Sequence, residues 1–459
     1  MPYETISGNY EKASRLSHST AAVRAIADQR SFFVPGEAVR NMEPIKERVR
    51  PRSDTKLPDD ANRLEVALAV DGSYVVEPVR DGLPSVMYGF AQVAAAYVDL
   101  AVMETQRAEV FVDPHAIQEA VNTALLTVDL PAAGAYTREN VDIVTSWREA
   151  LYQVFRTKSV EFNDVDKPLL ELLFILKGEP GKPATTLPVN CPNPECNTKE
   201  IPVPSFGGDC PKCETKLYPT DSLRIYEAVT EDGDNKSAMG RLMSVLELLV
   251  LVGLATFLWE RARKTVLPRT LFIVDGPLAV FGESAKLRAW ALDYFQAMAA
   301  NSPGGAPYIV GIEKSSAMVD FAGQLVKHEV LAPGDLLVCD QEVLSRIANT
   351  NNVAAYGKET YWGRKFIYRA LDGRVVVISV LPPKGEPYSS SGGMPDPSNY
   401  PALPAILDVI DRTGSSMYLN GIIPVAAAHG RAAFPIGVGT DVLRLVAMKR
   451  LGLGGDIVE

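Results

Sequence analysis

The first half of the chain contains short apolar runs, which are typical of strands, and a longer segment with helical periodicity. The apolar run at residues 66–70 predicts a buried strand, and Asp71-Gly72 directly after it predicts a tight turn at the strand end. Residues 91–102 and 109–112 are expected to continue the sheet. Residues 116–174 are predicted to be mainly helical, because apolar side chains recur there at spacings of three and four.

The second half of the chain is predicted to alternate strands with helices. Predicted strands cover residues 271–274, 309–312, 336–338, 366–368 and 375–380, and predicted helices cover residues 237–264, 287–300, 402–410 and 441–450. Mixed strands and helices in this order predict an α/β domain that is interrupted once.

The interruption lies at residues 177–221, where the composition changes to Pro, Gly, Asn and Cys. Cys191 and Cys196 form one close pair, and Cys210 and Cys213 form a second pair after thirteen intervening residues. Two such pairs are typical of a zinc ribbon, in which four thiolates close a structural tetrahedral site. A disulfide pairing is the alternative, and a reducing compartment disfavours it. Cys339 stands apart and is expected to be a small buried side chain.

Composition places the chain among ordinary globular proteins. It has 459 residues, 47% of them hydrophobic, and its 46 basic and 56 acidic side chains give a net charge of −10. This excludes wholesale disorder and disfavours a non-specific nucleic-acid coat, although a local basic groove stays possible. No secretory signal is expected in the first residues, and the apolar stretch at 248–259 is too short to span a membrane, so a cytoplasmic protein with a buried core helix is predicted.

The N-terminal region contains basic residues at alternating positions, namely Lys46, Arg48, Arg50 and Arg52. An extended backbone would present them on one side, where they could follow phosphates. The alternative is a solvated arm, since acidic residues and Pro51 interrupt the pattern.

Two aspartates follow apolar runs and could share one cation. Asp71 follows the run at residues 66–70, and Asp275 follows the run at residues 271–274; each precedes a glycine. Carboxylate oxygens suit hard ions such as Mg²⁺ and Mn²⁺. Taken singly, either Asp-Gly pair could equally be a common turn.

Glu247 makes a metal site more plausible. It lies within an apolar helical segment, and no Lys or Arg lies within one turn. An unpaired buried carboxylate costs several kcal/mol, so Glu247 must be protonated, reach a cation such as Arg241, or bind a metal.

These motifs, in this order, resemble the NurA nuclease family over roughly residues 60–450. The resemblance rests on the Asp71 turn, Glu247 in its long helix, the Asp275 turn, the run Gly311-Ile-Glu-Lys314 and the run Pro424-Val-Ala-Ala-Ala-His429. It implies an RNase H-like mixed sheet flanked by helices. The implied domains are an N-terminal extension at residues 1–60, a nuclease domain at 61–450 and a zinc-ribbon insertion at 186–222.

The resemblance also implies an activity and its residues. Asp71, Glu247 and Asp275 would bind Mn²⁺ or Mg²⁺, and Lys314 and His429 would lie near the scissile phosphate. The implied protein is a 5′-to-3′ nuclease on DNA ends, a homodimer partnered by a hexameric ATPase of the HerA type, acting in DNA repair or anti-phage defence. The family's Tyr-Pro element before the late histidine is replaced here by a segment beginning at Tyr418, so no tyrosine is assigned.

Two other functions remain open from the sequence. A strand followed by Asp71-Gly72-Ser73 also resembles the phosphate loop of actin-like phosphotransferases, but no Gly-rich adenosine loop follows, and Pro277 occupies the second turn. The other alternative is a catalytically inactive zinc-ribbon adaptor of a DNA translocase, which the presence of all three carboxylates disfavours.

Overall fold

The computed structural model describes residues 43–54, 63–80, 83–108, 121–162, 165–348, 359–385, 395–414, 421–434 and 438–453. Residues 45–459 form one compact unit. The strand predicted at residues 109–112 and the residue Tyr418 lie outside the described residues.

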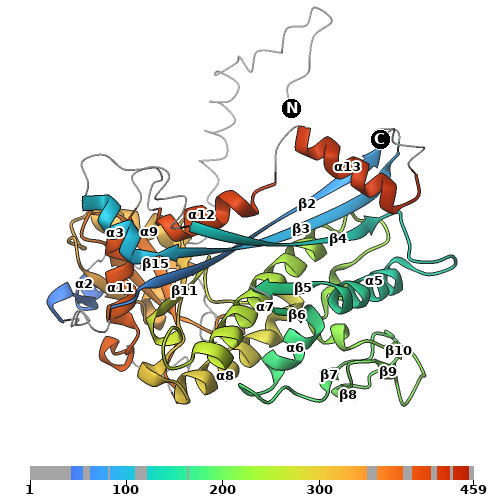
Figure 1. The fold of residues 1–459 in the computed structure, drawn as a ribbon, viewed down its shortest axis with the longest axis horizontal. Coiled ribbons are helices and arrows are strands. Elements are labelled where there is room, and N and C mark those ends of the chain that lie inside the picture. The colour runs from blue at the N-terminus through green and yellow to red at the C-terminus, as the bar shows by residue number, and fades with distance from the viewer. Residues whose placement is uncertain are drawn as a thin grey trace, which may run out of the picture. The chain divides into compact units, whose positions relative to one another are not determined.

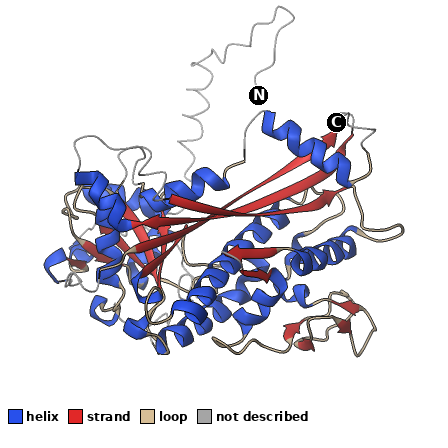
Figure 2. Ribbon diagram, in the orientation of Figure 1, coloured by secondary structure: helices blue, strands red, loops and turns tan. Residues whose placement is uncertain are grey.

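The unit is built on a nine-stranded mixed sheet (Figures 1 and 2). From edge to edge its strands are β1 (Val49–Arg50), β13 (Leu336–Val338), β14 (Arg364–Arg369), β15 (Val375–Val380), β12 (Tyr308–Glu313), β11 (Thr270–Asp275), β2 (Val66–Arg80), β3 (Leu83–Asp99) and β4 (Val121–Ala133). β2, β3 and β4 are antiparallel neighbours, whereas β2, β11 and β12 are parallel. Three antiparallel strands followed by two parallel ones form the expected RNase H-like core, so the predicted fold class is confirmed.

Helices cover both faces of the sheet (Figure 2). They are α2 (Glu43–Lys46), α3 (Leu100–Ala108), α5 (Ile143–Thr157), α6 (Leu169–Lys177), α7 (Lys236–Ala262), α8 (Leu287–Ala300), α9 (Ala317–Lys327), α10 (Gln341–Ala348), α11 (Leu403–Arg412), α12 (Ile423–Ala432) and α13 (Val438–Arg450). Small two-stranded sheets are formed by β5 (Ser159–Phe162) with β6 (Val165–Pro168), β7 (Leu187–Val189) with β8 (Ile201–Val203), and β9 (Gly208–Asp209) with β10 (Lys216–Leu217).

Alternation along β2 divides the core into two layers. Leu68 and Val70 belong to the cluster that includes α5, α6, α7 and α8, whereas Ala67 and Ala69 belong to the cluster with α11 and α12. Successive side chains of a strand point to opposite faces, so odd-numbered residues of this part of β2 face α12 and even-numbered residues face α7.

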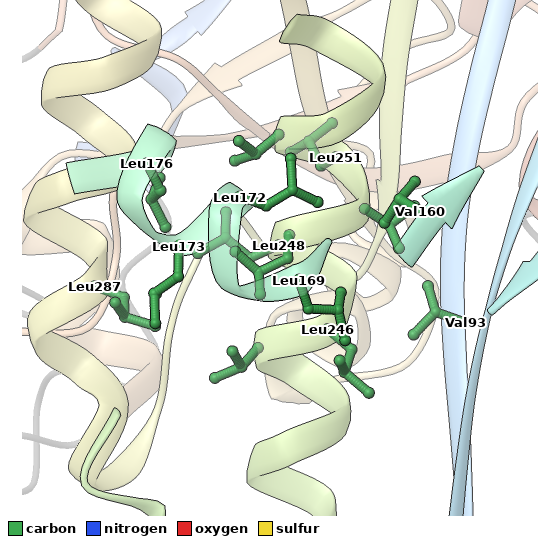
Figure 3. Close-up of a cluster of buried hydrophobic side chains, with 14 of the residues drawn as sticks. Val93, Val160, Leu169, Leu172, Leu173, Leu176, Leu246, Leu248, Leu251 and Leu287 are labelled. Carbon is green, nitrogen blue, oxygen red and sulfur yellow. The ribbon is translucent and has the colours of Figure 1, made fainter. Parts of the chain in front are cut away.

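The long apolar helix predicted at residues 237–264 is α7. Its leucines interlock with those of α6 and α8; Leu248 and Leu251 lie among Leu169, Leu172 and Leu287 (Figure 3). Among the described residues it is the one helix that is long and apolar enough to cross a membrane, but most of its apolar window is buried inside the protein, as expected for a core helix.

Three predictions about the first half are wrong. Residues 100–102, expected to continue the strand from residue 91, begin helix α3 instead. Residues 121–133, expected to be helical, form β4, because pairing with β3 over twelve positions outweighs the local apolar spacing. The turn expected at Asp71-Gly72 is absent, since β2 continues to Arg80. The helix around Trp147 is α5, as predicted.

The basic residues near the N-terminus contact the compact unit. β1 pairs with β13, and Arg48 binds Asp340 at 2.6 Å and Glu342 at 2.6 Å. Arg50 donates to the carbonyl oxygens of Glu47 and Val49, and Arg52 lies 3.5 Å from Asp411. A free phosphate-tracking row is therefore not formed by Arg48, Arg50 and Arg52.

Candidate active site

Asp275 lies where the predicted turn begins, at the last position of β11. Gly276 follows with φ +115°, a backbone conformation that residues other than glycine rarely adopt. Its N–H donates to Ile312 O at 2.8 Å. The chain thus leaves the sheet immediately after Asp275, at the carboxyl edge of the parallel strands.

Asp71 reaches the same edge in a different way. β2 pairs with β11 only up to Val70–Val274, so β2 runs on alone on that side from Asp71. Asp71 is an odd-numbered residue, and it faces α12, where its Oδ2 lies 2.7 Å from His429 Nδ1. The carboxylate therefore sits beside the end of β11 without any turn in its own strand.

Gly72 opens the sheet to Glu247 from the opposite layer. A Cβ atom built on Gly72 would lie 2.9 Å from Glu247 Oε1 and 3.0 Å from Met243 Cγ. The N–H of Gly72 itself donates to Asp71 Oδ1 at 2.9 Å. Because residue 72 has no side chain, the Glu247 carboxylate approaches Asp71 from the α7 face.

Lys314 and His429 bring positive charge to the carboxylates. Lys314 follows β12, and its Nζ lies 2.7 Å from Asp275 Oδ2. His429, on α12, lies 3.9 Å from Asp275 Oδ2 as well as beside Asp71. All five residues predicted for the site thus come together from β2, α7, β11, the end of β12 and α12.

The carboxylates lie close enough that the negative charge of one raises the pKa of another. Burial and the charge of Asp275 raise the pKa of Asp71, although His429 acts in the opposite direction. Burial, with the charges of Asp71 and Asp275, raises the pKa of Glu247 to about 8. Arg241, the alternative partner of Glu247, is instead ion-paired with Glu283. A cation between these groups would relieve their repulsion.

The donor set fits a divalent metal ion. Ligand atoms of Asp71, Asp275 and His429 all lie within 4.8 Å of one another. Two carboxylates and one imidazole suit a first-row divalent ion such as Mn²⁺, and carboxylates alone suit Mg²⁺. Glu247 lies outside this group of three, so in this arrangement His429 is the third donor beside the two aspartates.

These residues line a cavity of about 660 Å³, within the range of small-molecule and cofactor sites. Its wall includes residues that are not among the five predicted for the site. Glu313, the residue before Lys314, makes a buried ion pair with Lys365 at 2.5 Å. Phe281 and Tyr361 form another part of the wall. Of these wall residues, Glu313 has a sequence signal, its place in the Gly311–Lys314 run; Phe281 and Tyr361 lie in segments without any motif.

The four clustered cysteines are also brought together. Their sulfur atoms lie within 4.8 Å of one another, with Cys191–Cys213 at 3.5 Å and Cys196–Cys210 at 3.8 Å. Sulfurs around a tetrahedral zinc ion lie about 3.8 Å apart, because each Zn–S bond is about 2.3 Å. All four are free thiols, which excludes the disulfide alternative in this structure. Hydrogen bonds with Thr215 lower the pKa of Cys213 to about 6, which favours the thiolate that zinc requires.

The cysteine module has a small apolar cluster of its own, made by Val189, Val203 and Leu217 around the cysteines. It is joined to the main unit through Arg148 of α5, which makes a buried ion pair with Asp221 at 2.8 Å. Cys339, by contrast, is fully buried on its own after β13, as expected.

No family model matches this chain, and no curated protein matches it. Solved structures with similar folds include the NurA nuclease from Sulfolobus solfataricus, at 11% identity and a TM-score of 0.37, with 95% of each chain covered. A structure of NurA bound to dAMP and manganese overlaps at 10% identity and a TM-score of 0.31, covering 95% of this chain and 97% of the other.

Proposed function

We propose that this protein is a metal-dependent DNA nuclease. The carrying observation is the convergence of Asp71, Glu247 and Asp275, from two strands and a helix, on one cavity that also contains a lysine and a histidine. Metal-assisted phosphodiester hydrolysis needs this combination, since carboxylates hold cations and basic groups offset the charge of the phosphate.

Each residue has a distinct part in this proposal. Asp71, Asp275 and His429 would hold one divalent ion, Mn²⁺ or Mg²⁺, and Glu247 would either complete its coordination or accept a proton from water. A bound ion of this kind lowers the pKa of water and stabilises the leaving oxygen. Lys314, held by Asp275, faces the cavity where a phosphate would lie and offsets its charge.

We further propose, from the family resemblance of the sequence motifs, a homodimer in the cytoplasm that works with a hexameric ATPase of the HerA type. The context would be DNA-end processing, in repair or in defence against phage. The net charge of −10 supports dependence on a partner, because a strongly acidic protein binds DNA weakly at physiological salt.

Incubation of supercoiled and linear plasmid with the purified protein tests the activity. Cleavage should require Mn²⁺ or Mg²⁺ and should be lost in Asp275→Asn, which keeps the side-chain shape but removes the charge. Cleavage that persists undiminished in Asp275→Asn, or in the presence of a chelator, would contradict the proposal. DNA binding without any cleavage in either metal would favour the adaptor.

A further inference from the structure

An aromatic pair forms one wall of the cavity that contains the carboxylates. The rings of Phe281 and Tyr361 meet edge to face, with centroids 5.8 Å apart and planes at 85°. Tyr361 is only 7% exposed, whereas Phe281 leaves 51% of its surface open to solvent. Both side chains line the same cavity as Asp71, Glu247 and Asp275.

The loop that bears Phe281 is held firmly to the segment that bears Tyr361. Ala279 bridges to Tyr361, Val280 N donates to Thr360 O at 2.8 Å, and Trp362 N donates to Leu278 O at 2.9 Å. Leu278 and Val280 are buried in the main core. The exposure of Phe281 is therefore not a consequence of a loose loop, because its neighbours on the chain are anchored.

The Tyr361 ring also contacts a cation. Lys365 Nζ lies 4.4 Å from the centre of that ring, and the same amine is held by Glu313 at 2.5 Å. A cation over a ring face favours one ring orientation. Tyr361 thus supports Phe281 as a rigid neighbour, and the exposed half of the Phe281 surface remains available for contact.

We propose that Phe281, supported by Tyr361, stacks on a nucleobase of the strand whose phosphate lies at the carboxylates. This inference rests on the proposed nuclease function and names the form of DNA that the site takes. A base can lie on an aromatic ring only when the ring replaces its neighbour in the stack, so the site selects an unpaired or frayed strand over a closed duplex. Stacking is tolerant of sequence, since every base has a π face.

Binding measurements with a fluorescent base test this directly. An oligonucleotide with 2-aminopurine at its unpaired end is titrated with protein in Ca²⁺, and quenching reports stacking. Phe281→Leu, which keeps an apolar side chain but no ring, should lower the affinity for the unpaired end about 5- to 100-fold and abolish quenching. Phe281→Trp should restore both. Phe206→Leu is the matched control, because Phe206 is a 79% exposed ring on the cysteine module, away from this cavity.

Cleavage provides the second measurement. In Mn²⁺, wild type should cut frayed ends faster than blunt ends, and Phe281→Leu should lose this preference while its melting temperature stays near that of wild type. If Phe281→Leu keeps both quenching and preference, the stacking assignment is wrong while the nuclease proposal stands. If wild type binds and quenches but never cuts, the nuclease proposal fails while the stacking assignment stands; a wild type without quenching overturns the stacking assignment.

Discussion

At the scale of single residues, Glu247 combines an unfavourable environment with a candidate chemical role. Its pKa is raised to about 8, so below that pH the folded protein holds a proton that the unfolded chain releases above about pH 4.3. Stability that depends on Glu247 is thus greatest below the unfolded pKa and is lost as the pH rises from about 4.3 to about 8. Glu247→Gln removes this dependence.

We therefore expect Glu247→Gln to lower nuclease activity at least ~100-fold, as for loss of a metal-binding carboxylate, without lowering stability. In chelator, the melting temperature of the variant should exceed that of wild type by a margin that grows between pH 5 and 8. Added Mn²⁺ should stabilise wild type more than the variant. The control is Glu260→Gln, near the C-terminal end of the same helix, where Glu260 pairs with Lys167 at 3.2 Å. A folded Glu247→Gln variant that cleaves at the wild-type rate would contradict the assignment.

Glu313 and Lys365 are two buried groups of opposite charge that form an ion pair, unlike Glu247, which lies near other carboxylates. Glu313 is 7% exposed and Lys365 is 2% exposed, so removing one partner leaves the other charged and buried. Lys365→Met should lower the free energy of unfolding by about 3–5 kcal/mol. The double variant Glu313→Gln/Lys365→Met should recover most of that loss in urea melts. Additive losses in the double variant would show that the two residues do not interact.

At the scale of elements, one missing Cβ on β2 lets α7 contribute to the site. Gly72→Ala would place its Cβ 2.9 Å from Glu247 Oε1, at the flexible end of that side chain. We expect Glu247 to be displaced, so that activity falls about 10-fold or more while stability changes little. Gly430→Ala on α12 is the control, because a Cβ there meets nothing within 4 Å and should be neutral or slightly stabilising. Equal activity in both variants would argue against this role for Gly72.

The cysteine module should depend on zinc more than the main unit does. Its apolar cluster is small, so metal binding should supply much of its folding free energy. Elemental analysis should find about one zinc ion per chain, and Cys213→Ser should lose it, whereas Cys339→Ala should keep it. In the Cys213→Ser protein, limited proteolysis should cut first within residues 187–217. Full protease resistance without zinc would contradict a structural metal site.

At the scale of the whole molecule, periodicity predicted the elements that pack by apolar faces better than those defined by long-range pairing. The sequence predicted α7, α8, β13 and β15 within a few residues, because burial determines their patterns. β4 could not be predicted in this way, since its state depends on pairing with β3.

The site shows the same division. The five predicted residues do converge, since each lies close to a recognisable motif. The sequence could not predict that β2 continues through Asp71-Gly72. How far a strand extends beyond its paired neighbour depends on the whole sheet. Phe281, Tyr361 and Lys365 were not predicted for the same reason, because only folding brings their segments together.

The charge of the whole chain leads to the last prediction, which concerns partners. A net charge of −10 repels a DNA polyanion at long range, and Lys314 and His429 counter it only inside the cavity. We expect a homodimer by light scattering. DNA binding should be weak and should fall only shallowly between about 50 and 200 mM salt, because the salt dependence scales with the number of phosphates contacted and few are contacted here. Added hexameric ATPase of the HerA type should increase the rate of end degradation, because a translocase holds the DNA that the nuclease alone cannot retain.

The Asp275→Asn protein is the control, and it should bind the ATPase but degrade no DNA. Rapid, processive digestion by the isolated protein at physiological salt would show that the site needs no such partner.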